Sequence, residues 1–211
     1  MKAGVWVQRT LIDEGRVQVV DGDSKSRIWL RVNMNDGPPF MICGVYSPVV
    51  KRNGERKMKA DDDTAAKKFW VELSSEVAGY VNKNLGVVVM GDMNARIGER
   101  VGDEKTNENG KRMINMCDTH DLRIMNTMRA NGVMTRMKGI EKSILDYLIV
   151  DEIAEQNLVD MRVINEDMSS DHLMIEGKWK MERRVEQMKE RSEEMEDTIW
   201  PKGGRGVEGV S

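Results

Sequence analysis

Hydrophobic and polar residues alternate with a period of two over the first part of the chain. Ile28, Leu30 and Val32, for example, alternate with arginine and tryptophan, which is typical of a strand with one face in the core. Asp-Gly, Asn-Asp-Gly and Pro-Pro turn sequences separate such stretches. We therefore predict four strands, over Gly4–Arg9, Arg16–Val20, Arg27–Asn33 and Phe40–Tyr46.

A helical period follows. Hydrophobic residues recur every three or four positions between Thr64 and Asn82, and the aspartates 61–63 suit the cap and first turn of this helix. The predicted elements are a helix over Thr64–Asn82, a strand over Val87–Met90, a helix over Lys111–Thr119, strands over Leu122–Asn126 and Ile144–Val150, a helix over Glu152–Asn157, and strands over Asp160–Asn165 and His172–Trp179. This order predicts an α/β sandwich in which two β-sheets pack face to face under outer helices.

Length and composition fit one domain followed by a tail. The chain has 211 residues, of which 39% are hydrophobic. We place the domain at residues 1–179, and a charged helical segment with a flexible end at residues 180–211. No stretch has the length of a membrane span, and no signal peptide opens the chain. Cys43 and Cys117 lie in predicted core elements, which indicates reduced thiols and an intracellular protein, nuclear or cytoplasmic.

Charge alone does not indicate a partner. The formal net charge is −3, which is not typical of a nucleic-acid-binding protein. Basic residues gather in Lys51–Lys59, which either follows a phosphate backbone or is a solvated loop, the commoner case. The case for a function therefore depends on particular side chains.

The first candidate chemistry is Gly91-Asp92-Met93-Asn94, directly after the hydrophobic run Leu85–Met90. Side chains alternate along a strand, so Asp92 and Asn94 share a side while Met93 points to the core. A carboxylate beside an amide can orient a water or hold a phosphate oxygen near a hard cation. An Asx turn after a strand explains the same residues equally well.

Two further segments add acids and an imidazole. Asp146 lies inside the hydrophobic run Ile144–Val150, where an acid is costly without a partner, and Asp171-His172 precedes the last predicted strand. Asp146 as a cap and His172 as a surface imidazole are the structural alternatives. Together the acids and the histidine allow an Asp-oriented imidazole and a carboxylate-bound metal in one site, as in metal-assisted hydrolysis.

Three motifs in this order resemble the signatures GDxN, xDY and SDH of the endonuclease/exonuclease/phosphatase superfamily; they are Gly91–Asn94, Leu145–Tyr147 and Ser170–His172. More narrowly, the chain resembles endonuclease domains of LINE-type retrotransposons and craniofacial development protein 2-like sequences, through Gly91–Gly98, Asn107–Gly110, Ile124–Thr127 and Leu145–Val150. The resemblance runs from about Gly4 to about Trp179, and it implies a DNase I-like, four-layer α/β sandwich.

The resemblance also implies a chemistry, with Mg²⁺ (or Mn²⁺) as cofactor and DNA as partner. Asp92 would orient or activate the attacking water and contact the metal, and Asn94 would hold a phosphate oxygen. Asp171 would be a metal ligand. His172 would contact the scissile phosphate, and Asp146 would fix its tautomer. Whether His172 or Asp92 takes the proton of the water stays open.

Two further residues match the family with a structural alternative beside each. Tyr46 ends a predicted strand where the family places a phosphate-binding tyrosine, although an amphipathic tyrosine at a strand end is as common. Asn109 corresponds to a family asparagine near the phosphate. We favour Asn109 as the N-cap of the helix that follows it.

The chain also departs from the family. Family members carry an asparagine and then a metal-binding glutamate on earlier strands, and Gly4–Val7 resembles the strand after both. We therefore expect a domain that is incomplete at its N-terminus and binds a cation more weakly. The loop Met134–Lys138 has no tryptophan where relatives place one.

Three functions are consistent with these residues. The first is a retroelement-derived, Mg²⁺-dependent DNA endonuclease or phosphodiesterase, followed in longer relatives by a linker to a reverse transcriptase that residues 180–211 resemble. The second is a catalytically inactive, truncated remnant that acts as a binding module or has no function. The third is a phosphatase of the same fold.

Overall fold

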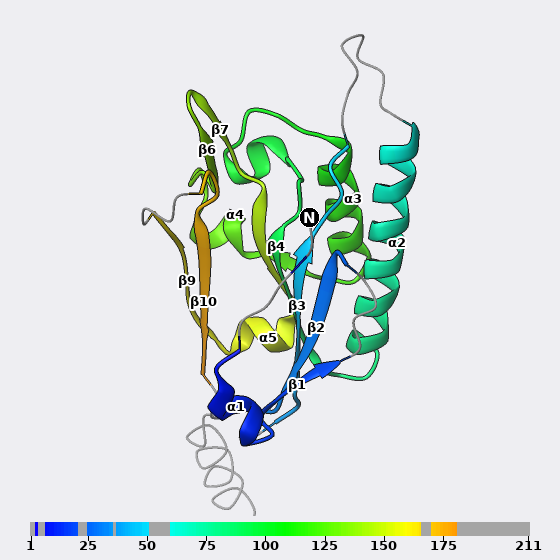
Figure 1. Cartoon of the computed structure of the whole chain (residues 1–211), viewed down its shortest axis with the longest axis vertical. Coiled ribbons are helices and arrows are strands. Elements are labelled where there is room, and N and C mark those ends of the chain that lie inside the picture. Colours follow the sequence, from blue (N-terminus) through cyan, green and yellow to red (C-terminus); the bar gives the residue numbers. More distant parts are fainter. Residues whose placement is uncertain are drawn as a thin grey trace, which may run out of the picture. The chain divides into compact units, whose positions relative to one another are not determined.

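A computed structural model describes residues 3, 7–20, 25–35, 37–50, 60–165 and 170–180 (Figure 1). Several sequence predictions lie outside these residues: the start of the first predicted strand (4–6), the basic segment 51–59, and all of the charged C-terminal segment beyond Lys180. None of the described helices is long and apolar enough to cross a membrane.

The centre of the described fold is a mixed sheet of six strands in the order β1-β2-β3-β4-β8-β5. The strands are β1 (Val17–Val20), β2 (Arg27–Val32), β3 (Phe40–Tyr46), β4 (Gly86–Asp92), β8 (Asp146–Val150) and β5 (Arg123–Ile124). β3 and β4 run parallel, and the other neighbours in the sheet are antiparallel. As a result, β3 and β4 end at the edge of the sheet where β8 begins.

Two long helices, α2 (Ala60–Val81) and α3 (Glu108–Thr119), cover one face of this sheet (Figure 1). Leu73 and Val77 of α2 are fully buried against sheet residues such as Cys43 and Val89. This larger of two hydrophobic clusters also holds Met93, so the residue between Asp92 and Asn94 points into the core, as alternation predicts.

The other face is covered by shorter elements. They are α4 (Met125–Arg129), α5 (Glu152–Gln156) and a two-stranded antiparallel sheet of β9 (Leu158–Ile164) and β10 (Met174–Trp179). Phe40, Val88 and Leu148 of the central sheet pack there with Met161 of β9. The mixed α/β class is therefore confirmed, and in the described residues the second sheet has two strands.

Several predicted elements differ from the structure. Arg9 does not end a strand but begins a one-turn helix, α1 (Arg9–Asp13), which Gly15 ends in the left-handed region at φ 67°. The second half of the predicted strand Leu122–Asn126 is helical, because α4 begins at Met125. Helix α2 begins at Ala60, so the three aspartates lie within its first turn and do not cap it.

Short elements were not predicted. A 3₁₀ turn, η1 (Gly98–Val101), and a hairpin of β6 (Arg136–Lys138) and β7 (Glu141–Ser143) lie in segments for which the sequence pattern predicts no helix or strand. The hairpin matters for the site, because its first strand forms a bridge to His172.

Candidate active site

Three of the predicted site residues lie side by side where the neighbouring strands β3 and β4 end and β8 begins. Tyr46 is paired with Asp92 across the parallel strands β3 and β4, and Asp92 is paired with Asp146 across the antiparallel strands β4 and β8. Directly paired residues project their side chains to the same face of a sheet. The strand register therefore brings these three side chains together, although they are far apart in sequence.

The backbone at the end of β4 has two unusual residues. Gly91 has φ 130°, and a Cβ there would lie 2.3 Å from the carbonyl oxygen of Val45. Asn94 has φ 44°, in the left-handed region that asparagine tolerates better than most residues. The Gly-Asp-x-Asn sequence thus has a structural reason: glycine permits close approach to β3, and asparagine turns the chain after Asp92.

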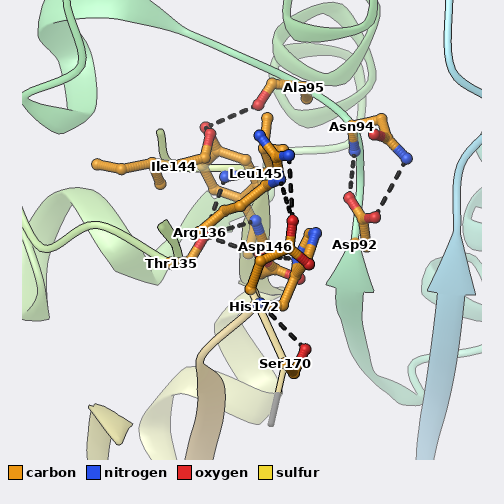
Figure 2. Close-up of polar contacts among 12 residues, drawn as sticks. Asp92, Asn94, Ala95, Thr135, Arg136, Ile144, Leu145, Asp146, Ser170 and His172 are labelled. Atoms are coloured by element: carbon orange, nitrogen blue, oxygen red, sulfur yellow. Dashed lines mark hydrogen bonds and ion pairs between the residues drawn. The ribbon is translucent and has the colours of Figure 1, made fainter. Parts of the chain in front are cut away.

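Asn94 holds the carboxylate of Asp92. Its backbone N–H donates to Asp92 Oδ1 at 2.8 Å, and its side-chain Nδ2 donates to Asp92 Oδ2 at 3.2 Å (Figure 2). The same Nδ2 also donates to the carbonyl of Ser47 at 2.9 Å. Both amide hydrogens are therefore committed in this structure. Asn94 fixes Asp92 here, and contact with a phosphate oxygen would require the longer of these two bonds to exchange.

Asp146 and His172 form a hydrogen-bonded pair. His172 Nδ1 lies 3.0 Å from Asp146 Oδ2 and 3.2 Å from Oδ1 (Figure 2). Asp146 is buried at the start of β8, and His172 is half-buried in the segment before β10. Thr135, just before β6, adds a hydroxyl at 2.8 Å from Asp146 Oδ2. Sequence reasoning missed Thr135, because one threonine in a polar stretch carries no pattern.

Burial and neighbouring charges set the protonation of this site. Burial raises the pKa of Asp92 to about 6; the backbone N–H of Asn94 opposes that shift, and the nearby Asp146 carboxylate adds to it. The hydrogen bond to Asp146 raises the pKa of His172 above its ordinary value, against the effect of burial. A carboxylate and an imidazole that lie together and whose pKa values are both raised, here Asp92 and His172, are typical of a functional site.

A divalent cation fits part of this donor set. Ligand atoms of Asp92, Asp146 and His172 all lie within 4.8 Å of one another among the described residues. Asp146 already accepts from Thr135 and His172, so the carboxylate of Asp92 is the oxygen donor best suited to a hard cation.

Asp171, the second predicted metal ligand, lies outside the cluster that contains Asp92. It is exposed, and Arg136 of β6 pairs with it through Nε and Nη2, each at 3.1 Å from Oδ2. Asp171 is not part of the cluster of Asp92, Asp146 and His172. Its carboxylate could join a cation there only after release from Arg136.

Asn109 is not the helix N-cap that we favoured. The cap of α3 is Asn107, whose side chain accepts from the backbone N–H of Gly110 at 2.8 Å. Asn109 lies in the first turn and is 1% exposed; its amide donates to the carbonyl of Pro48 at 2.9 Å and accepts from Trp70 Nε1 at 3.2 Å. Asn109 therefore ties helix α2 to the segment after Tyr46.

A family model described as endonuclease-reverse transcriptase matches residues 55–176. No curated protein matches the chain.

Solved structures match at low sequence identity. The endonuclease domain of TRAS1, a telomere-specific non-LTR retrotransposon, is 14% identical with TM-score 0.60, over 79% of this chain and 70% of that chain. The 3′ phosphatase NExo from Neisseria, bound to a product DNA hairpin, is 13% identical with TM-score 0.60, over 78% of this chain and 70% of that chain. The catalytic domain of Xenopus laevis APE2 is 14% identical with TM-score 0.56, over 74% of this chain and 56% of that chain. The likeness establishes a shared fold.

Proposed function

The chain belongs to the endonuclease-reverse transcriptase family of the endonuclease/exonuclease/phosphatase superfamily, and on this premise we propose that it is a Mg²⁺-dependent phosphodiesterase that cleaves DNA and derives from a retroelement. One observation carries the proposal: the Asp146–His172 pair, joined at 3.0 Å, lies beside the half-buried carboxylate of Asp92. An oriented imidazole next to an acid of raised pKa suits in-line attack of water on a phosphodiester.

The side chains divide the work as follows. Asp146 occupies Nδ1 of His172, which leaves Nε2 for the scissile phosphate. Asp92 orients the attacking water, and Asn94 holds Asp92 and, after exchange of one bond, a phosphate oxygen. Tyr46, in register with Asp92, adds its hydroxyl from the neighbouring strand. Asn109 does not need to touch the substrate in this scheme: its amide binds the carbonyl of Pro48 and so fixes the segment after Tyr46.

The metal would be held by Asp92, with Asp171 as a further ligand once Arg136 releases it. Mg²⁺ is the proposed ion, and Mn²⁺ suits the same oxygen donors. When bound, such an ion supplies Lewis-acid stabilisation of charge on the phosphate oxygens.

We place the domain at residues 1–179, as a DNase I-like four-layer sandwich to whose second sheet β9 and β10 belong. Within the family, LINE-type endonucleases and craniofacial development protein 2-like sequences are the proposed nearest relatives. The tail from residue 180 would lead to a reverse transcriptase in longer relatives, and the location would be nuclear or cytoplasmic.

Two observations favour other functions. The ion pair of Asp171 with Arg136 favours an inactive remnant, because it withdraws a proposed ligand from the cation. The structural match to a protein named a 3′ phosphatase favours a phosphomonoesterase of the same fold.

Nicking of supercoiled plasmid DNA by the purified full chain, with and without Mg²⁺, separates these functions. We expect Mg²⁺-dependent nicking that falls by about 10²–10⁴-fold in His172→Ala, as for a positioned acid or base. His120→Ala is the matched control, because it removes the other histidine of the chain, which contacts Ser74 and not the site.

Equal nicking by His172→Ala and the parent would refute the proposal. Release of phosphate from a DNA 3′ end without nicking would assign the phosphatase. A folded chain inactive in both assays with Mg²⁺ and with Mn²⁺ would be the remnant.

A further inference from the structure

Thr135 is a fully buried residue to which the proposed chemistry gives no part. Its hydroxyl accepts from the backbone N–H of Leu145 at 2.9 Å and of Asp146 at 3.0 Å, and it lies 2.8 Å from Asp146 Oδ2 (Figure 2). A hydroxyl has one hydrogen and two acceptor lone pairs. Because backbone amides can only donate, the single hydroxyl hydrogen must point to Asp146 Oδ2.

This arrangement determines the direction of the next hydrogen bond. Asp146, ionised and acceptor-only, receives the hydroxyl of Thr135 and faces Nδ1 of His172 with both oxygens. Nδ1 must then carry the hydrogen, which leaves the lone pair of neutral His172 on Nε2. The hydroxyl of Thr135, two hydrogen bonds away, thus determines which nitrogen of the His172 imidazole carries the hydrogen.

The backbone of Thr135 holds the histidine side of the same pair. Its carbonyl accepts from the N–H of Leu173, the residue after His172, at 2.7 Å, and its own N–H donates to Ser143 at 3.1 Å. Arg136, the next residue, forms a bridge with His172. Thr135 therefore contacts the segment that carries Asp146 with its side chain and the segment that carries His172 with its backbone.

We propose that Thr135 is a positioning residue that clamps Asp146 and so keeps neutral His172 in the tautomer with the hydrogen on Nδ1. The inference concerns the geometry of the pair itself. Its consequence for rate rests on the proposed function, and its spectroscopic consequence does not.

The first test is nitrogen-15 NMR of the imidazoles, without metal, at an alkaline pH above which their nitrogen-15 shifts no longer change, so that the tautomers of the neutral rings are measured. The chain has two histidines, so His120, whose ring contacts Ser74, is an internal reference. We expect His172 as the Nδ1–H tautomer in the parent and in Thr135→Ser, which keeps the hydroxyl. Thr135→Val, which keeps the shape without the hydroxyl, should move part of His172 to the Nε2–H tautomer. Unchanged tautomer populations in Thr135→Val would overturn the inference.

Thr135→Val leaves two backbone donors without an acceptor and is the variant most at risk of not folding. The parent and Thr135→Ser decide the matter in that event. An Nε2–H tautomer of His172 in the parent, or its appearance in a folded Thr135→Ser chain, overturns the clamp.

The second test is the kinetics of DNA nicking. We expect Thr135→Val to lower kcat by about 10–100-fold, as for loss of a group that orients an active-site ligand, with KM changed by less than about twofold. Thr135→Ser should retain kcat to within about threefold. Thr119→Val, which removes an exposed hydroxyl on α3, is the matched control.

The two tests separate this inference from the proposed function. A tautomer that responds to Thr135→Val in a chain that does not nick DNA would refute the function and leave the clamp standing. Nicking by the parent, with both the nicking rate and the tautomer populations unchanged in Thr135→Val, would refute the clamp alone.

Discussion

Asp92 is the residue at which function and stability oppose each other. Burial raises its pKa to about 6 in the folded chain, above its ordinary 3.8. The folded state thus binds this proton more tightly than the unfolded state does. The stability contributed by Asp92 is therefore greatest at low pH, falls as pH rises through this window, and stays low above about 6.

We predict that Asp92→Asn makes the metal-free chain more stable at neutral pH while it abolishes nicking. The expected gain is about 1 kcal/mol, because loss of the hydrogen bond from Asn94 Nδ2 offsets part of the relief of buried charge. The gain should vanish toward about pH 4, where the parent carries a protonated Asp92. Urea unfolding at both pH values measures it, with the exposed Asp118→Asn as control. Lower stability of Asp92→Asn at neutral pH would contradict the prediction.

Asn109 offers the opposite case, a site neighbour whose amide is fully used by the fold. We predict that Asn109→Ala costs about 2–3 kcal/mol, since it leaves the buried Trp70 Nε1 without its acceptor and removes the shorter hydrogen bond to the carbonyl of Pro48. Asn115→Ala on the exposed side of the same helix should change stability by less than about 0.5 kcal/mol. Equal denaturation midpoints of the two variants would show that the Asn109 amide adds nothing.

At the scale of elements, helix α3 packs unusually close to the loop after Asp92. A Cβ on Gly110 would lie 2.0 Å from the carbonyl oxygen of Arg96, whereas a Cβ on Gly79 in α2 meets nothing within 4 Å. We therefore expect substitution by alanine to have opposite effects on stability at these two helical glycines.

We predict that Gly110→Ala destabilises the fold by about 2–3 kcal/mol, because backbone must move to admit the methyl group. Gly79→Ala should stabilise it by about 0.5–1 kcal/mol through helix propensity alone. Thermal unfolding of both variants measures the difference. A Gly110→Ala chain as stable as the parent would mean that α3 tolerates a shift from the loop.

The same scale shows what sequence patterns can and cannot predict. Phe40–Tyr46 was predicted to the residue because a hydrophobic run between turn signals has few other structures. The β6–β7 hairpin was missed, since its three-residue strands are polar and show no alternation. The predicted strand Leu122–Asn126 was wrong in its second half, although the side-chain amide of Asn126, in α4, bonds to the backbone of Asp146 and Leu148 in β8.

For the site, motif order predicted which residues carry chemistry, and the register of the strands decides which of them meet. Asp92 and Asp146 lie in buried strands whose pairing is strongly specified. Asp171 lies in an exposed turn, where a local partner, Arg136, decides its position, and no pattern in the sequence foretells that ion pair.

At the scale of the whole molecule, hydrophobic burial on both faces of the central sheet holds the described fold. We therefore predict that EDTA abolishes nicking but leaves the far-UV circular dichroism spectrum unchanged, unlike in a zinc finger. Saturating Mg²⁺ should raise the stability of the parent by about 1 kcal/mol by mass action and that of Asp92→Asn by less. Unfolding on chelation would show that the ion is structural.

The lateral row of Tyr46, Asp92 and Asp146 has an evolutionary consequence. Because successive side chains of a strand face opposite sides of the sheet, insertion or deletion of one residue within β4 would turn Asp92 away from both neighbours. An in-frame length change in residues 86–92 should therefore remove the chemistry of a copy of this gene even where Tyr46, Asp92 and Asp146 are all retained. Copies that still cut should differ in length only in the loops.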